Sequence, residues 1–345
     1  MRIIIAGPIP DKCKSGGVAV FDKNLALQLA ENKSNEILIA TKKPNLINKK
    51  DQYPDNIHFT KISNIIRLKK FGADTIISCL WYSLFFCYGF NKVVKIHTIH
   101  AFPDFVSYKI WKFNVMHIID NFLRKRFDFL VANSKFTRYL YESLFNIKID
   151  GLYTIGLDPN VISFLKKKSE EKVVKGRNIL YVGRIVKAKH LDQALEAVSK
   201  LRQSEYRRFN IWGYGIEEKK LKKKYEDNHQ ILFHGAMNHF DVYKAYQSNK
   251  VFISLNPAEP FGITYEEAIA NGLYVVAPDT GGGVDFLSNY PDRCSLVDVN
   301  DIDSIVNGIK RGLQSKLNPL SNDSLDELSY SNTVKQIFEV VKRDS

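Results

Sequence analysis

The chain has 345 residues, of which 45% are hydrophobic and 25% are charged. These are ordinary globular values that exclude a disordered or collagen-like chain, and the length suggests two domains of roughly 150 residues each. The net charge of +13 lies in one half: residues 1–175 carry 28 basic and 15 acidic side chains, whereas residues 176–345 carry 22 of each. This asymmetry indicates an anionic partner for the first half: nucleic acid, a membrane surface or an acidic small molecule.

The cysteines and the apolar segments indicate a cytoplasmic protein. Neither a CxxC pair nor a disulfide framework connects the four cysteines, so free thiols in a reducing compartment are expected. The apolar run at residues 3–6 is soon interrupted by Gly and Pro, which is typical of a first buried strand and not of a signal peptide. The longest uncharged stretch, residues 75–91, is shorter than the about 20 residues of a spanning helix, so it predicts a strand followed by a buried or interface-lying helix.

Short β-branched runs alternate with helical patterns through the first half of the chain. Such alternation predicts βα units and a parallel sheet that is buried on both faces. The predicted strands lie at residues 3–6, 36–40, 75–79, 93–98 and 129–133, and the predicted helices at 18–30 and 135–145.

A lysine-rich segment at residues 166–172 has little pattern and predicts a solvated linker, after which the alternation starts again. The second set of strands is predicted at residues 178–182, 209–212, 231–233, 251–255 and 274–277. The helices between and after them are predicted at residues 191–202, 217–225, 241–247 and 264–271, with a final amphipathic helix at 323–343.

The predicted fold class is therefore α/β, with two Rossmann-like, doubly wound domains that face each other across a cleft. The expected division is an N-terminal domain at 1–160, a linker at 161–177, a second domain at 178–322, and a C-terminal helix at 323–345. One possible arrangement packs this helix back on the first domain. Ligands of open α/β sheets bind at the carboxyl ends of the strands, so the cleft is the expected site.

The first candidate site is a glycine pair after the first strand. Gly16 and Gly17 open a predicted helix, where backbone N–H groups can approach an anion; a plain tight turn is the alternative. The pattern is not the Rossmann GxGxxG, and the next strand is followed by Thr41-Lys42-Lys43 instead of a ribose-binding carboxylate. An NAD site is therefore not expected.

The second candidate is a pair of cations after the strand at 178–182. Gly183 opens space there, Arg184 follows it, and Lys189 comes five residues later. The planar fork of Arg can bind two phosphate oxygens while Lys acts as a point charge, so the pair suits a diphosphate. Ordinary surface cations are the alternative.

The third candidate is a pair of carboxylates eight positions apart. Glu259 lies in a Pro/Gly loop, and Glu267 lies about one turn into a predicted helix, where it could accept the hydroxyls of a vicinal diol. The alternative for Glu267 is a T-x-x-E capping box with Thr264. A fourth candidate, the glycines after the strand at 274–277, predicts either an anion-binding nest or a flexible turn.

Together and in this order, these motifs resemble the donor half of the retaining GT-B glycosyltransferases of family four. The matching pieces are Gly183-Arg184 with Lys189, Gly213-Tyr214-Gly215, Phe233-His234-Gly235, Glu259 to Glu267 around Pro260-Phe261-Gly262, and Thr280-Gly281-Gly282. The first half matches through Gly16-Gly17, His100, Ala132-Asn133-Ser134 and Ile155-Gly156-Leu157-Asp158. The resemblance covers most of the chain and implies a GT-B fold, with an acceptor-binding domain at 1–160 and a nucleotide-sugar-binding domain at 178–322.

The resemblance also implies a role for each matching residue. Glu267 would bind the nucleotide ribose, Arg184 and Lys189 would neutralise the diphosphate, and Glu259 would hold hydroxyls of the transferred sugar. The remaining donor-binding positions, several of which would contribute backbone amides, are Gly16, Gly17, Gly183, Gly213, Phe261, Gly262, Ile263, Gly281 and Gly282. His100 would act on the acceptor side.

The chain departs from the family pattern at several positions. His190 stands where a Gly usually follows the lysine, Asp285 where Glu is common, and Ala101 where Asp often follows the histidine. A satisfied strand-end histidine is the alternative for His100. His97 and His100 would make a poor metal pair in a strand, and the motifs contain no carboxylate pattern of a required metal. We therefore expect metal-independent transfer and no cofactor.

The expected function is transfer of a sugar from a nucleoside-diphosphate sugar, a UDP-sugar more than a GDP-sugar, with retention of anomeric configuration. The expected enzyme is a hexosyl- or N-acetylhexosaminyltransferase of bacterial-type surface polysaccharide or glycoconjugate synthesis, with a glycan or polyprenyl-diphosphate-linked acceptor. One alternative is another GT-B enzyme of epimerase or phosphorylase type. The other is a basic nucleic-acid-binding protein, which we do not expect because the basic residues are scattered.

The basic, aromatic first half also predicts where the protein works. Between residues 102 and 126, Lys and Arg are interleaved with Phe, Tyr and Trp. Such a surface could rest on anionic lipid headgroups at the inner face of the plasma membrane. Aromatics in a helix core beside ordinary surface charges are the alternative.

Overall fold

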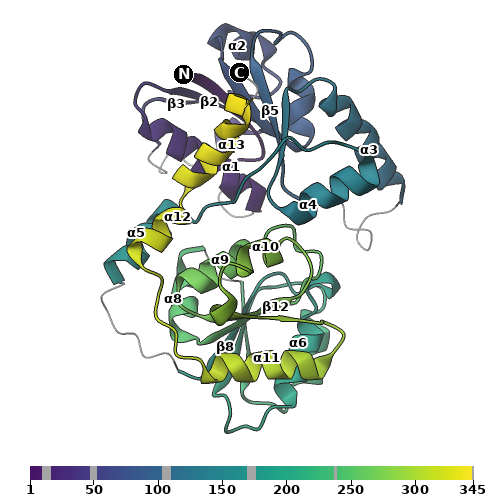
Figure 1. Ribbon diagram of the computed structural model, residues 1–345, viewed down its shortest axis with the longest axis vertical. Coiled ribbons are helices and arrows are strands. Elements are labelled where there is room, and N and C mark those ends of the chain that lie inside the picture. The colour runs from purple at the N-terminus through teal and green to yellow at the C-terminus, as the bar shows by residue number, and fades with distance from the viewer. Residues whose placement is uncertain (10–16, 47–52, 103–109, 169–175, 237–238, 344–345) are drawn as a thin grey trace. The chain divides into compact units, whose positions relative to one another are not determined.

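The computed structural model describes residues 1–9, 17–46, 53–102, 110–168, 176–236 and 239–343. The chain forms two compact units, one of residues Met1–Pro159 with Ser329–Ser345 and one of residues Asn160–Leu328 (Figure 1). Each unit contains a parallel sheet whose strands alternate with helices, as the pattern of the sequence predicts. We call them unit 1 and unit 2.

Unit 1 is built on a seven-stranded parallel sheet of order β3-β2-β1-β4-β5-β6-β7. Its strands are β1 (Arg2–Ala6), β2 (Glu36–Thr41), β3 (Ile57–Lys61), β4 (Thr75–Cys79), β5 (Val94–Ile99), β6 (Phe129–Ala132) and β7 (Gly151–Leu152). Its helices are α1 (Gly17–Glu31), α2 (Ile65–Phe71), α3 (Ile110–Arg124), α4 (Lys135–Leu140) and α13 (Tyr330–Arg343), with 3₁₀ turns η1 (Pro44–Leu46) and η2 (Leu80–Phe86) and the π-helical turn η3 (Tyr141–Phe145).

Unit 2 is built on a six-stranded parallel sheet of order β10-β9-β8-β11-β12-β13. Its strands are β8 (Asn178–Val182), β9 (Arg208–Trp212), β10 (Ile231–Gly235), β11 (Val251–Ile253), β12 (Tyr274–Pro278) and β13 (Cys294–Val297). The helices are α5 (Pro159–Lys168), α6 (Leu191–Ser199), α7 (Glu218–Lys224), α8 (His239–Ser248), α9 (Ile263–Ala270), α10 (Gly283–Leu287), α11 (Ile302–Gln314) and α12 (Asn322–Glu327), with 3₁₀ turns η4 (Lys187–Lys189) and η5 (Pro291–Arg293).

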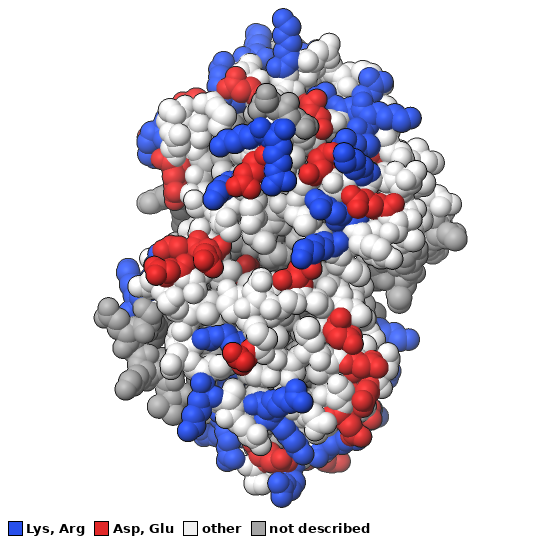
Figure 2. Space-filling view, in the orientation of Figure 1, with Lys and Arg blue, Asp and Glu red and all other residues white. Residues whose placement is uncertain are grey.

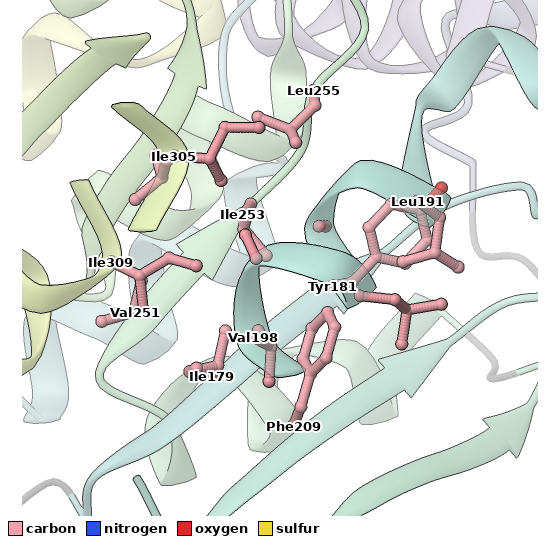
Figure 3. Packing of buried hydrophobic residues seen from close by; sticks show 14 of the residues in the cluster. Ile179, Tyr181, Leu191, Val198, Phe209, Val251, Ile253, Leu255, Ile305 and Ile309 are labelled. Atoms are coloured by element: carbon pink, nitrogen blue, oxygen red, sulfur yellow. The ribbon is translucent and has the colours of Figure 1, made fainter. Parts of the chain in front are cut away.

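The apolar runs become strands because a doubly wound sheet buries both of its faces. In unit 2, Ile179 of β8 and Val251 of β11 lie on the face that α6 and α11 cover, and Figure 3 shows Val198 of α6 and Ile309 of α11 packed against them. All four side chains are completely buried. This core holds the strand ends, and therefore the loops that follow them, in fixed positions.

Two expectations about the elements are wrong. The segment expected to be a linker, residues 161–177, is helical up to residue 168 because it begins within the ten-residue helix α5, and its residues 169–175 lie outside the described part of the chain. The C-terminal helix expected at 323–343 is two helices, because α12 ends at Glu327 and α13 begins at Tyr330. The interruption coincides with the passage of the chain from unit 2 back to unit 1, where α13 packs on α1 and β7.

Candidate active site

The predicted donor residues lie at the carboxyl-terminal edge of the unit 2 sheet. The strand order reverses between β8 and β11, and a reversal of this kind opens the crevice in which doubly wound sheets bind ligands. The loop after β8 carries Arg184 and Lys189, and the loop after β11 carries Glu259. The fold thus brings residues that are 70 positions apart to one crevice.

Lys189 and Glu259 form an ion pair across this reversal point. The Nζ atom of Lys189 lies 2.5 Å from Oε2 of Glu259, and both side chains are about one-fifth exposed. The same carboxylate oxygen accepts a hydrogen bond of 3.1 Å from Nδ2 of Asn256. A half-buried carboxylate with two fixed donors is well placed to exchange one of them for a ligand.

Arg184 lies on the same edge with its side chain exposed. The hydroxyl of the buried Tyr181 donates a hydrogen bond of 2.7 Å to the backbone carbonyl of Arg184, which holds the start of the loop. Burial raises the pKa of that phenol, the charge of Glu259 adds to the rise, and the charge of Arg184 opposes it. The charges of Glu259 and Arg184 therefore both act on the Tyr181 hydroxyl, which lies beneath the loop.

The glycines after β8 and β9 allow the two loops to touch. Gly213 has a φ of +147°, and a Cβ atom built on it would lie 1.8 Å from the carbonyl oxygen of Gly183. Its N–H donates to the carbonyl of Gly235 at 2.8 Å. Gly183 and Gly213 therefore serve a close backbone approach, which makes them part of the frame of the crevice.

Helix α9 begins beside Glu259 in a way that excludes the capping box. Its N-cap is Gly262, in the left-handed region with φ of +90° and with no side-chain cap, so Thr264 lies inside the helix. A Cβ on Gly262 would lie 2.2 Å from the ring of Tyr265, which packs directly under it. The first hydrogen bond of the helix runs from the N–H of Tyr265 to the carbonyl of Gly262 at 2.8 Å. The amides of Ile263 and Thr264 precede it at the helix N-terminus, a position that suits a phosphate oxygen.

Glu267 is held from behind by a tyrosine that sequence reasoning does not identify. The hydroxyl of Tyr246, a completely buried residue of α8, donates a hydrogen bond of 2.8 Å to Oε2 of Glu267. Glu267 itself is 8% exposed. Its neighbour Glu266 is buried as well, and burial together with the charge of Glu267 raises the pKa of Glu266 well above its ordinary value.

The glycine loop after β12 supports the Glu259 loop. The N–H of Gly282 donates to the carbonyl of Glu259 at 2.7 Å, and the hydroxyl of Thr280 donates to the carbonyl of Pro257 at 3.2 Å. Gly281 has a φ of +91°, and a Cβ there would lie 3.0 Å from the Pro257 carbonyl. The amide of Gly282 thus supports the Glu259 loop, and the donor-binding role of Gly281 and Gly282 stays a prediction.

The site residues predicted in the first half of the chain lie in unit 1. Gly16 falls outside the described residues, and Gly17 is exposed at the start of α1. His100 follows β5 and is 8% exposed; its Nδ1 lies 3.0 Å from the Tyr153 hydroxyl and its Nε2 lies 3.3 Å from the Thr98 hydroxyl. Burial lowers the pKa of His100 to about 3, so the ring is neutral. Its acceptor-side role stays a prediction.

Sequence reasoning missed the residues that hold the site from behind: Tyr181, Tyr246, Asn256 and Tyr265. Only Asn256 carries a local signal, because it is a polar residue directly after the strand that the sequence predicts at 251–255. The tyrosines look like core residues in the sequence, and only their hydrogen bonds reveal what they do.

Comparison with known proteins supports the resemblance. Residues 163–327 match the family model of the glycosyl transferases group 1. Over 257 residues the chain is 26% identical to an uncharacterized 41.2 kDa protein in the cps region of Klebsiella pneumoniae. This aligned stretch covers 70% of each of the two chains.

Two solved structures share the whole fold. Sucrose-phosphate synthase from Thermosynechococcus elongatus superimposes with a TM-score of 0.74 at 15% identity and covers 99% of this chain and 98% of its own. The Anabaena protein HepE, solved in complex with UDP and glucose, gives a TM-score of 0.73 at 14% identity and covers 99% and 100%. The two parallel sheets and these structures identify a GT-B fold, and residues 163–327 of the chain match the glycosyl transferases group 1.

Proposed function

We propose that this protein is a retaining glycosyltransferase that moves a hexose or N-acetylhexosamine from a nucleoside-diphosphate sugar to a glycan or lipid-linked acceptor. The observation that carries the proposal is the Lys189–Glu259 pair at the reversal point of the unit 2 sheet, next to the uncapped first turn of α9. This pair places a cation that would bind a phosphate beside a carboxylate that would accept sugar hydroxyls.

The chemistry of the transfer explains why cations are needed there. As the glycosidic bond to the diphosphate breaks, negative charge grows on the leaving group. Lys189, Arg184 and the amides at the start of α9 would stabilise that charge more in the transition state than in the ground state. These groups do the work that a divalent metal does elsewhere, so we propose that transfer needs no metal.

The carboxylates would orient the two ends of the donor. Glu267, whose Oε2 is held by the hydroxyl of Tyr246, would accept the ribose hydroxyls. Glu259 would release Lys189 to the diphosphate and accept hydroxyls of the transferred sugar. Asn256 would keep the Glu259 carboxylate in place during that exchange.

We propose a UDP-sugar as the donor and a surface polysaccharide or glycoconjugate as the product. The first part rests on HepE, a protein of the same fold whose structure contains UDP and glucose. The second rests on the Klebsiella pneumoniae relative, whose name places it in a cps region.

A thermal-shift screen of nucleoside diphosphates and their sugars, followed by transfer assays, tests this function. We expect UDP to raise the melting temperature, and the product to keep the donor's anomeric configuration in NMR spectra. Stabilisation by GDP alone would change the donor, and donor turnover without transfer or with net epimerisation would favour a GT-B enzyme of another reaction. If Glu267→Ala, Arg184→Ala and Lys189→Ala all transfer normally, the assignment is wrong; oligonucleotide binding at physiological salt would instead favour the nucleic-acid alternative.

We further propose that α3 rests on an anionic membrane surface. Four apolar residues form one stripe along this helix: Trp111, Val115, Ile118 and Phe122. Trp111 is 57% exposed and Ile118 is 70% exposed, although both are large and apolar. Among the described residues, no helix is both long enough and apolar enough to cross a bilayer, so the contact would be peripheral.

Cations border this stripe. The guanidinium of Arg126 lies 4.7 Å from the ring centre of Tyr88 and 5.6 Å from that of Phe122, and Lys125 beside it is exposed. Unit 1 carries 26 basic and 15 acidic residues, whereas unit 2 carries 24 and 22. Figure 2 shows Lys and Arg distributed over one face of unit 1, with uncharged side chains and some Asp and Glu between them. Apolar side chains beside cations suit an anionic lipid surface.

Liposome flotation tests the membrane contact. We expect binding to anionic vesicles that weakens with salt, little binding to neutral vesicles, and loss of binding in Ile118→Asp. Ile216→Asp in unit 2 is the matched control, because Ile216 is also an exposed isoleucine. Equal, salt-independent partitioning to both vesicles, or equal binding by the Ile118 and Ile216 variants, would contradict the proposal.

A further inference from the structure

A buried cluster of metal-ligating side chains lies in unit 1, outside the proposed donor site. It consists of Asp22, Cys79 and His100, which contribute a carboxylate oxygen, a sulfur and a ring nitrogen within 4.8 Å of one another. Cys79 ends β4 and His100 follows β5, while Asp22 reaches them from α1. We propose that these three residues bind a zinc ion that fixes α1 to the strand ends.

The position of the cluster is where a doubly wound sheet offers space. The order of the unit 1 sheet reverses between β1 and β4, so the ends of these strands diverge. Gly7 follows β1, and a Cβ atom there would lie 1.8 Å from Oδ2 of Asp22. The carboxylate thus fills the space that a side chain at position 7 would take.

The distances suit tetrahedral zinc. The Sγ atom of Cys79 lies 3.6 Å from Oδ2 of Asp22. With Zn–S of about 2.3 Å and Zn–O of about 2.0 Å, a tetrahedral angle separates the two ligand atoms by about 3.5 Å. Cys, His and Asp are the ligand types that zinc takes, and a fourth position remains for water.

A dication would balance the charges of the ionised ligands. Asp22 is 2% exposed and Cys79 is completely buried. The thiol of Cys79 is the hydrogen-bond donor to Asp22, and it is a weak donor. A carboxylate and a thiolate together with Zn²⁺ and a neutral imidazole give a net charge of zero. A neutral site can be buried at far lower cost than a lone carboxylate.

Hydroxyl groups lie on both ring nitrogens of His100, so a metal ion would take the place of one of them. Its ring lies between hydroxyl partners, Thr98 on Nε2 and Tyr153 on Nδ1, and the ring of Phe21 lies edge-on at 4.7 Å between centroids. When one ring nitrogen binds a metal, the hydrogen bond on the other orients the ring and supports its basicity. The ion would be structural, and this assignment is an alternative to the acceptor-side role that the resemblance implies for His100.

Metal analysis of the untagged full-length protein, purified without chelators from zinc-supplemented medium, tests the proposal. We expect about one zinc per chain, and at least about tenfold less in the double variant Asp22→Asn with Cys79→Ser. Cys294→Ser is the matched control, because Cys294 lies in unit 2 and should leave the zinc content unchanged. Tyr153→Phe should weaken zinc affinity roughly 10- to 100-fold.

A second measurement does not depend on the folding of variants. Cobalt added to the metal-free wild-type chain should produce a thiolate-to-cobalt charge-transfer band in the near ultraviolet, and zinc should raise the melting temperature. A wild-type chain without zinc and without that band overturns the proposal. Equal zinc in the wild type and in a folded double variant overturns it as well.

Discussion

The Lys189 ammonium and the Glu259 carboxylate lie 2.5 Å apart, although 70 positions separate them in the sequence. One follows β8 and the other follows β11, the two strands between which the order of the sheet reverses. The pair therefore exists because of the topology of the sheet. It gives the proposed donor site a cation and a carboxylate that neutralise each other until a ligand separates them.

Lys189→Met should lower the rate of transfer at least roughly tenfold, because a charge-assisted bond to the leaving diphosphate is worth about 1.5–3 kcal/mol. Steady-state kinetics and calorimetric titration with the nucleoside diphosphate would measure the loss in rate and in affinity. Lys200→Met is the control, since Lys200 forms an exposed ion pair with Asp303 at 3.0 Å. A similar loss in both variants would point to a general charge effect instead of the site.

Tyr246→Phe should weaken binding of the nucleoside diphosphate while the chain stays folded. The change removes one hydroxyl, and with it a buried hydrogen bond to Glu267 that is worth about 0.5–1.5 kcal/mol. Calorimetric titration should therefore show roughly a two- to tenfold loss of affinity. Unchanged affinity would mean that Glu267 keeps its position without Tyr246.

Gly213→Ala should destabilise unit 2 by at least about 2 kcal/mol, because the new Cβ would collide with the Gly183 carbonyl. Gly235→Ala is the matched control: Gly235 also has a positive φ, +80°, but no atom lies within 4 Å of its added Cβ. That variant should lose only about 1 kcal/mol, the strain of the backbone conformation. Chemical denaturation of the two variants would show whether the close approach or the dihedral angle dominates.

His190→Gly should stabilise the protein by about 1 kcal/mol. His190 joins η4 to α6 in the left-handed region, with φ of +49° and ψ of +38°, where a side chain is strained and glycine is not. His190→Ala keeps that strain and should bring no such gain. A denaturation curve in which the glycine variant is no more stable than the alanine variant would contradict this.

Asp120→Asn should remove a loss of stability that the wild type shows as pH rises. Burial raises the pKa of Asp120 to about 7, although a hydrogen bond from the Tyr141 hydroxyl opposes the rise. The folded chain therefore keeps a proton that the unfolded chain loses above pH of about 4, so stability falls between pH of about 4 and 7. The variant should gain stability relative to the wild type at pH 8 and little at pH 4, as measured by denaturation at both values.

Much of the fold could be predicted from local patterns. The apolar runs at residues 3–6 and 178–182 became β1 and β8, because a strand that is buried on both faces needs no polar positions. The break between α12 and α13 could not be predicted, since both helices are amphipathic and the residues between them carry neither Gly nor Pro. Only the return of the chain to unit 1 separates them.

The same division holds for the candidate site. Arg184, Lys189, Glu259 and Glu267 could be named from spacing and from the resemblance, because short motifs after strands are local. The capping box at Thr264 is absent, because the N-cap of α9 lies two residues earlier, at Gly262, which lies against the ring of Tyr265. A T-x-x-E pattern indicates that a side chain could cap a helix. Where the helix begins depends on how its first residues pack against their neighbours.

By itself the sequence determined the class of fold, the two sets of βα units and the half of the chain that carries the excess positive charge. Each of these follows from composition and from the periodicity of apolar residues, which can be read along the chain without knowing which distant residues meet. The tertiary structure decided that Lys189 pairs with Glu259, that Tyr246 holds Glu267, and that Asp22, Cys79 and His100 meet in one buried cluster. Such meetings depend on the order of the strands in a sheet, which no local pattern contains.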